Sequence, residues 1–155
     1  MTRNAIIKKL KNYFDVTELV CPHAYKKFGE YAWQVIKTEQ LHALLIVRED
    51  ILKCPMYIND WHTGGIFSQR GTRCNACKLV VNKKGKPYLS AHTYGGGDDF
   101  TCSDYTAEES RKLIKENADL FPFPIRLEYG KSWVHMDTND YEYNLYGDWV
   151  YEFKV

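Results

Sequence analysis

Three consecutive glycines, Gly95 to Gly97, lie between His92 and Asp99 and exclude a helix through this part of the chain. Glycine is among the poorest helix formers. The backbone must bend here instead, because glycine readily takes positive φ angles. Such a bend would bring Asp99 back beside His92 from a second extended segment. We therefore expect these two side chains to meet at one point of the fold.

A second imidazole follows in the run Trp133 to Asp137, which has the alternation of a strand. Alternation puts His135 and Asp137 on one face, with the side chains between them directed to the core. Together with His92 and Asp99, His135 completes a set of two neutral imidazoles and one carboxylate. Three protein ligands leave one position for water on a tetrahedral Zn²⁺ ion, which is typical of catalytic sites. The sequence thus predicts a zinc site and hydrolytic chemistry.

Length and composition limit the other possibilities. A chain of 155 residues with 45% hydrophobic residues is expected to form one domain, spanning residues 1–155. With 21 basic and 20 acidic side chains, it has no charge excess to bind nucleic acid. The N-terminus lacks the apolar run of a signal peptide or membrane span, so we expect synthesis in the cytoplasm and no membrane partner. The sequence predicts no oligomeric state.

The five cysteines are an odd number in a chain too large to need disulfides, so we expect reduced thiols. Cys74 and Cys77 have the spacing of metal ligands, but no second pair follows at the distance typical of zinc fingers. We interpret them as incidental thiols of a loop, and His23 as a surface residue. A redox protein that uses Cys74 and Cys77 is an alternative.

Hydrophobic periodicity predicts a helical N-terminal half and a strand-rich C-terminal half. Apolar residues recur at helical spacing, and Thr38 is a candidate cap for the second of these runs. The capping-box sequence at Thr106 predicts a further helix. Expected helices span 6–14, 41–52 and 106–120, a long loop spans 59–86, and strands span 56–58, 125–129, 133–137 and 149–153. Because short strands close in sequence favour antiparallel pairing, the predicted class is α+β with a small antiparallel sheet.

The pattern Ser-x-His-x-x-Gly-x-Gly-x-Asp at 90–99, followed by Trp-Val-His at 133–135, resembles a known family. It is similar to the zinc D-alanyl-D-alanine carboxypeptidases and phage endolysin peptidases, relatives of the D,D-dipeptidases and of the hedgehog signalling domain. Segments at 58–61, 64–65 and 68–73 resemble the substrate loop of that family, so the likeness covers about residues 15 to 140. The resemblance implies a hedgehog/D,D-peptidase-like fold, with helices on one side of a small antiparallel sheet.

The resemblance also implies roles for individual residues. His92, Asp99 and His135 would bind Zn²⁺, as the residue pattern alone also predicts. Arg73 would bind the carboxylate of the substrate, with Arg70 the second match. The side chains that would bind the substrate backbone are Ser90 and Gln69.

The general base is less directly indicated. Many relatives carry an acid or a histidine three residues before the last zinc ligand, where this chain has Ser132. A serine cannot take a proton near neutral pH. Glu128, which resembles an acid found slightly earlier in some members, is our preferred base. Asp137 is the alternative, although it could equally orient a ligand.

These residues predict a zinc metallopeptidase that hydrolyses peptidoglycan stem peptides, either as a D-Ala-D-Ala carboxypeptidase or as an L-Ala-D-Glu endopeptidase. A phage or prophage lysis enzyme that acts at the cell wall is compatible with a small chain of this kind. The alternative is a zinc-stabilised, catalytically weak binding domain of hedgehog-like fold. The missing acid at Ser132 keeps that alternative open.

Overall fold

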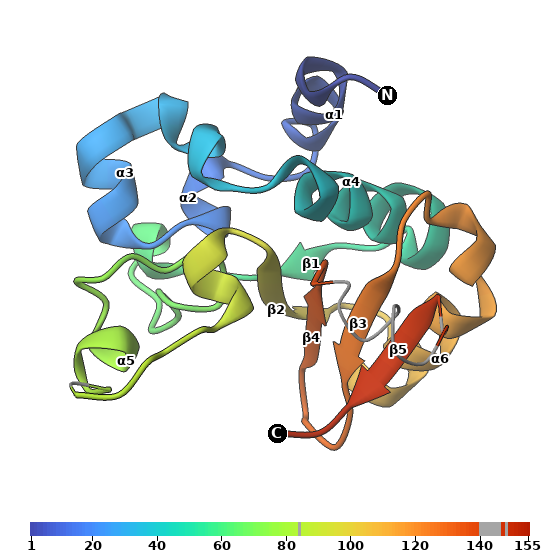
Figure 1. Cartoon of the computed structure of the whole chain (residues 1–155). Helices are drawn as coiled ribbons and strands as arrows, with labels where there is room; N and C mark the ends of the chain where they lie inside the picture. Colours follow the sequence, from blue (N-terminus) through green and yellow to red (C-terminus); the bar gives the residue numbers. More distant parts are fainter. Residues whose placement is uncertain (84, 140–146, 148) are drawn as a thin grey trace.

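A computed structural model gives the fold of the chain and describes residues 1–83, 85–139, 147 and 149–155. The N-terminal third is helical, as its apolar periodicity predicts (Figure 1). Its elements are α1 (Arg3–Leu10), α2 (Val16–Leu19), α3 (Pro22–Phe28), η1 (Gly29–Val35), α4 (Thr38–Ile46) and η2 (Val47–Leu52).

The second predicted helix differs from the structure at both ends. Lys37, not Thr38, is the N-cap of α4, and the Thr38 hydroxyl accepts a hydrogen bond from Arg3 Nη1 at 2.8 Å. The apolar run continues to Leu52, but from Val47 onward the helix has π geometry. It ends at Lys53, whose φ of 56° is left-handed.

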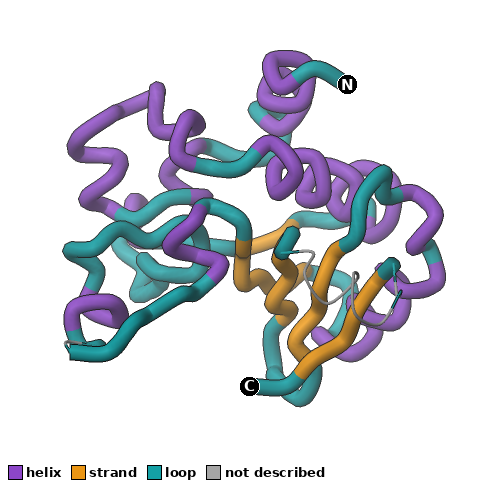
Figure 2. Tube along the Cα trace, viewed as in Figure 1, coloured by secondary structure: helices purple, strands orange, loops and turns teal. Residues whose placement is uncertain are grey.

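Short elements occupy the segment that the sequence predicts as a long loop. They are η3 (Trp61–Thr63) and α5 (Lys78–Val81), and η4 (Ala91–Tyr94) follows them. A parallel bridge between Val20 and Thr72 joins this segment to the N-terminal helices. The loop-rich segment therefore lies beside α2 and α3 (Figure 2).

Five strands form one mixed sheet in the order β1-β2-β4-β3-β5. The strands are β1 (Met56–Tyr57), β2 (Gly97–Cys102), β3 (Ile125–Glu128), β4 (Val134–Asp137) and β5 (Val150–Phe153). Three pairings are antiparallel, but β5 pairs parallel to β3. The prediction of a purely antiparallel sheet is therefore wrong. Strand β5 pairs with β3 on the side away from β4, so the strand that precedes it in sequence is not its neighbour.

Alternation divides the side chains of the sheet between two faces. One face carries Phe100, Leu127 and Met136, all fully buried. Helix α4 reaches it through Gln40, whose Nε2 donates to the Met136 carbonyl at 3.3 Å, and α6 (Ala107–Glu116) contacts β4. The capping box that starts α6 is formed by Thr106 and Glu109, as predicted. The other face of the sheet carries the polar residues of the candidate site.

Buried apolar side chains from α1 to β4 form one cluster, so the helices and the sheet share a core. Among the helices in the described ranges, none combines the length and apolar character that a membrane crossing requires.

Candidate metal centre

The structure brings together the three residues that the sequence predicts as zinc ligands. His92 lies in the turn η4, Asp99 in β2 and His135 in β4, where Asp99 and His135 are directly paired. Gly95 ends the turn with a φ of +66°, and a Cβ there would lie 2.1 Å from the Val35 carbonyl oxygen. Only glycine fits this reversal, which places His92 over the paired strands.

The ligand atoms of these three residues all lie within 4.8 Å of one another. His92 Nε2 is 3.2 Å from His135 Nδ1 and 3.4 Å from Asp99 Oδ2. Ligands at about 2.0–2.2 Å from a tetrahedral Zn²⁺ ion are about 3.4 Å apart, so these two distances fit. The third, 2.7 Å between His135 Nδ1 and Asp99 Oδ1, is that of a close hydrogen bond.

Hydrogen bonds at the opposite ring nitrogens orient both histidines. His92 Nδ1 donates to the Gly71 carbonyl at 2.9 Å, and His135 Nε2 donates to Asp137 Oδ2 at 2.9 Å. The other nitrogen of each ring faces the Asp99 carboxylate, and once it has lost its proton it can bind a metal ion instead. Metal-binding histidines are held in this way in known sites. The donor set therefore fits a divalent cation.

The electrostatics of the cluster favour a positive charge among these groups. Burial lowers the pKa of His92, which keeps its ring neutral, the form that binds metals. Burial also opposes charge on His135, but hydrogen bonds to Asp137 and Asp99 outweigh it and raise the pKa of His135 to about 9. Burial disfavours the Asp99 anion, yet hydrogen bonds from His135 and His92 hold its pKa below the ordinary value.

The neighbouring carboxylate, Asp98, points to the opposite face of the sheet and does not join the cluster. It is almost fully buried and accepts a hydrogen bond from Gln40 Nε2 at 2.8 Å. Burial raises the pKa of Asp98 to about 7. Strand alternation thus gives two adjacent aspartates opposite environments, and only Asp99 reaches the histidines.

Asp137 is completely buried and fully engaged by partners. Besides His135, it binds Arg126, whose Nε and Nη2 lie 2.8 Å and 3.0 Å from its two oxygens. Burial raises its pKa, but the hydrogen bonds from His135 and Arg126 outweigh this and leave the pKa lowered. A carboxylate in this state is a poor proton acceptor and well suited to orient His135.

Glu128, the other candidate base, lies directly opposite His135 in the ladder between β3 and β4. It lines a cleft of about 430 Å³ together with the three candidate ligands. The Lys131 ammonium lies 3.2 Å from Glu128 Oε1. Ser132 is exposed on the turn that follows.

The predicted substrate-binding arginines occupy different places. Arg73 is buried, donates to the Tyr88 hydroxyl at 2.9 Å and to the Gln69 carbonyl, and has Nη2 3.5 Å from Asp99 Oδ2. It lines both the main cleft and a second cleft of about 360 Å³. Arg70 stacks on Phe67, 3.5 Å from the ring centre, and lines only the second cleft.

The remaining predicted site residues divide between the two clefts. Ser90 lines the main cleft beside His92. Gln69 lines the second cleft, but its side-chain oxygen already accepts a hydrogen bond from the Leu79 amide at 2.9 Å. Gln69 therefore holds the loop to the start of α5 by this hydrogen bond, in addition to lining the second cleft.

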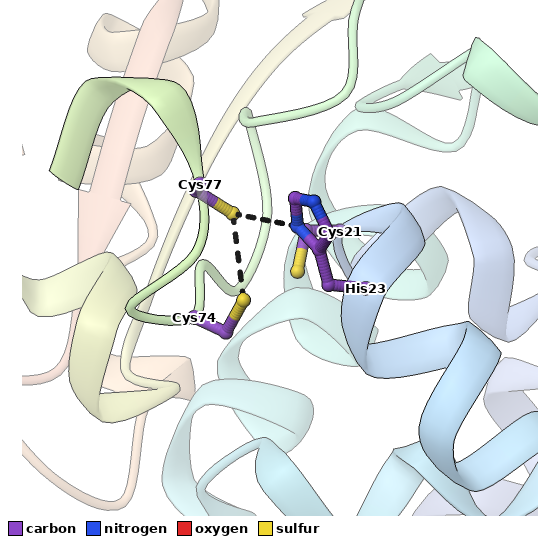
Figure 3. Close-up of side chains that lie close together, drawn as sticks. All are labelled: Cys21, His23, Cys74 and Cys77. Atoms are coloured by element: carbon purple, nitrogen blue, oxygen red, sulfur yellow. Dashed lines mark hydrogen bonds between the residues drawn. The ribbon is translucent and has the colours of Figure 1, made fainter. Parts of the chain in front are cut away.

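A second group of metal-binding side chains lies away from both clefts and was not foreseen as a unit. Cys21 and His23, at the start of α3, meet Cys74 and Cys77 of the loop before α5 (Figure 3). The sequence signal was present as Cys-x-His and Cys-x-x-Cys. The two patterns lie more than fifty residues apart, so their spacing in the sequence does not indicate that they meet.

Comparison of the chain with protein-family models, with curated proteins and with solved structures gave no significant match. The resemblance to zinc D,D-peptidases accordingly rests on the short motifs alone.

Proposed function

We propose that the chain is a zinc-dependent peptidase that hydrolyses peptidoglycan stem peptides. The observation that supports this most is the convergence of His92 Nε2, His135 Nδ1 and the Asp99 carboxylate, with each ring oriented by a hydrogen bond at its other nitrogen. The set lies in a cleft that also holds an acid and an arginine. The sequence motifs add the substrate class.

His92, Asp99 and His135 would hold the ion, and three protein ligands leave it open to substrate. Bound there, Zn²⁺ supplies a Lewis acid for a peptide carbonyl and acidifies water. Asp137 keeps the His135 ring oriented, and the Gly71 carbonyl does the same for His92.

Glu128 is the better placed of the two candidate bases. Asp137 is occupied by His135 and Arg126, whereas the side chain of Glu128 pairs with the partly exposed Lys131 ammonium. In the proposed reaction Glu128 takes a proton from the attacking water and returns it to the leaving amine nitrogen. Lys131 must move aside for this exchange.

Arg73 is the proposed anchor for a substrate carboxylate. It is buried next to Asp99, is oriented by Tyr88 and Gln69, and lines both clefts. A rigid guanidinium can form paired hydrogen bonds with a carboxylate. Whether that carboxylate is a peptide terminus or a side chain decides between a carboxypeptidase and an endopeptidase. The cell wall is the proposed place of action.

One observation favours the alternative, a zinc-stabilised binding domain with weak catalysis. Glu128 is ion-paired with Lys131, and Ser132 supplies no second acid. Both functions would retain zinc, so metal analysis alone does not separate them.

Defined muropeptides incubated with the zinc-loaded protein and analysed by mass spectrometry separate the two functions. We expect release of D-alanine or of L-Ala-D-Glu fragments by the wild type. Glu128→Gln is expected to lose about 100- to 10,000-fold in rate while retaining zinc. The matched control Glu116→Gln, on the exposed side of α6, should keep full activity. Muropeptides left intact by zinc-loaded wild type would contradict the peptidase and favour the binding domain.

A further inference from the structure

Four side chains that form a compact cluster outside the clefts have the chemistry of a metal site. The Sγ atoms of Cys21, Cys74 and Cys77 and a ring nitrogen of His23 all lie within 4.8 Å of one another. Figure 3 shows the four side chains pointing toward a common centre. All five cysteines of the chain, each within the described ranges, are free thiols.

Two separations within the cluster match those of a tetrahedral zinc complex. Cys77 Sγ lies 3.9 Å from Cys74 Sγ and 3.8 Å from His23 Nδ1. With Zn–S bonds of about 2.3 Å and Zn–N bonds of about 2.0–2.1 Å, tetrahedral ligands are about 3.8 Å apart for two sulfurs and about 3.6 Å apart for sulfur and nitrogen. The cluster therefore needs little rearrangement to close around an ion.

We propose that Cys21, His23, Cys74 and Cys77 bind a second zinc ion, with a structural role. Three thiolates and one imidazole complete a tetrahedral shell and leave no position for substrate, as in structural zinc sites. Soft sulfur ligands favour zinc over the hard cations that bind carboxylates. None of the four residues lines either cleft described above.

The ion would join two segments that already meet at a short backbone bridge. Around the Val20–Thr72 bridge, the Cys21 amide donates to the Thr72 carbonyl at 3.0 Å, and the Thr72 amide donates to the Leu19 carbonyl at 2.9 Å. Closer to the start of the loop, Asn59 Nδ2 and Trp61 Nε1 also donate to the Val20 carbonyl, at 3.2 Å and 3.1 Å. Ligands on both sides of the bridge would lock the loop to the start of α3.

The same loop residues support the first metal centre. Gly71 supplies the carbonyl that fixes His92, and the Arg73 amide donates to the His92 carbonyl at 2.9 Å. Arg73 also lies directly before Cys74 in the chain. The second ion would thus fix the segment that orients one ligand and places the arginine of the cleft. This positioning role rests on the proposed function, but the binding of the ion does not.

Counting metal ions per chain tests the proposal without an activity assay. Native mass spectrometry of the full chain, purified reduced and loaded with zinc, should find two ions. Cys74→Ser/Cys77→Ser should retain one ion, and the matched control Cys54→Ser/Cys102→Ser should retain two. His92→Ala/His135→Ala should also retain one ion, which separates failure of the first site from failure of the second.

Cobalt substitution identifies the ligands of the retained ion. The wild type and His92→Ala/His135→Ala should show near-ultraviolet sulfur-to-cobalt charge-transfer absorption, and Cys74→Ser/Cys77→Ser should lack it. A His92→Ala/His135→Ala chain that binds no ion, or a wild-type chain that binds cobalt without this absorption, would overturn the second site.

Should the serine variant fail to fold, alkylation of the wild type gives the same answer. Zinc should protect Cys21, Cys74 and Cys77 until a chelator is added, whereas Cys102, which lies outside the cluster, should react equally in both states. Equal alkylation of the three cluster cysteines with and without zinc would also overturn the proposal.

Discussion

Asp137→Asn tests whether the partner of His135 sets the affinity of the first metal centre. The substitution keeps the shape of the side chain. It removes the negative charge of the carboxylate that accepts a hydrogen bond from His135 Nε2 at 2.9 Å. An amide can also present its NH₂ group to the ring, which would favour the wrong tautomer. The lone pair of Nδ1 would then no longer be held toward the other ligands.

The expected loss of zinc affinity is about 10- to 100-fold, the range found when partners of metal-binding histidines are removed. This corresponds to roughly 1.4–2.7 kcal/mol of binding free energy. The free energy of unfolding should fall as well, because buried Arg126 loses its anionic partner at 2.8 Å and 3.0 Å. Breaking a buried ion pair costs about 3–5 kcal/mol, and the remaining amide hydrogen bond should keep the loss near the lower end.

Competition with a chromophoric chelator measures the zinc affinity directly. To isolate the first site, both proteins should carry Cys74→Ser/Cys77→Ser. The matched control is Asp119→Asn, which removes the same charge from an exposed position. An Asp137→Asn variant that binds zinc as tightly as the control would refute the idea that Asp137 orients His135.

Three further substitutions test other parts of the structure. Gly71→Ala should lower the free energy of unfolding by about 1–3 kcal/mol in urea denaturation, because its Cβ would lie 2.2 Å from the Leu19 carbonyl oxygen; unchanged stability would contradict this contact. Phe100→Ala should cost about 3–5 kcal/mol in the same assay, since the ring is fully buried, and a loss under 1 kcal/mol would show a less compact core. Arg73→Lys should raise KM for muropeptides about tenfold or more, because a hydrogen bond between charged groups contributes roughly 1.5–3 kcal/mol and lysine lacks the paired donors; an unchanged KM would remove Arg73 from substrate binding.

The sequence predicts where these strands lie better than it predicts which strands pair. The expected strands at 125–129, 133–137 and 149–153 differ from β3, β4 and β5 by one residue at one end. Alternation and turn residues are local signals, and they are strong here. The parallel pairing of β5 with β3 depends on how the chain passes the sheet, which no local pattern records.

Helix geometry shows the same limit. The apolar residues from 41 to 52 recur regularly, and helical structure does continue to Leu52. Their spacing does not distinguish the α-helix from the π-helical turns after Val47.

The three candidate ligands of the first centre could be predicted because two short motifs contain them. The groups that orient these ligands were harder to predict. The Gly71 carbonyl is a backbone atom without a side-chain signature, and Asp137 stayed an alternative base until its contacts with Arg126 and His135 were known. The cysteine cluster could not be predicted from residue spacing, because its two halves lie far apart in the chain and come together beside the Val20–Thr72 bridge.

Anomalous diffraction at the zinc absorption edge, from crystals of the zinc-loaded protein, tests the central claim most directly. We predict a peak at bonding distance from His92 Nε2, His135 Nδ1 and the Asp99 carboxylate. The absence of a peak at these three groups in fully loaded crystals would contradict the metal centre, and with it the proposed peptidase.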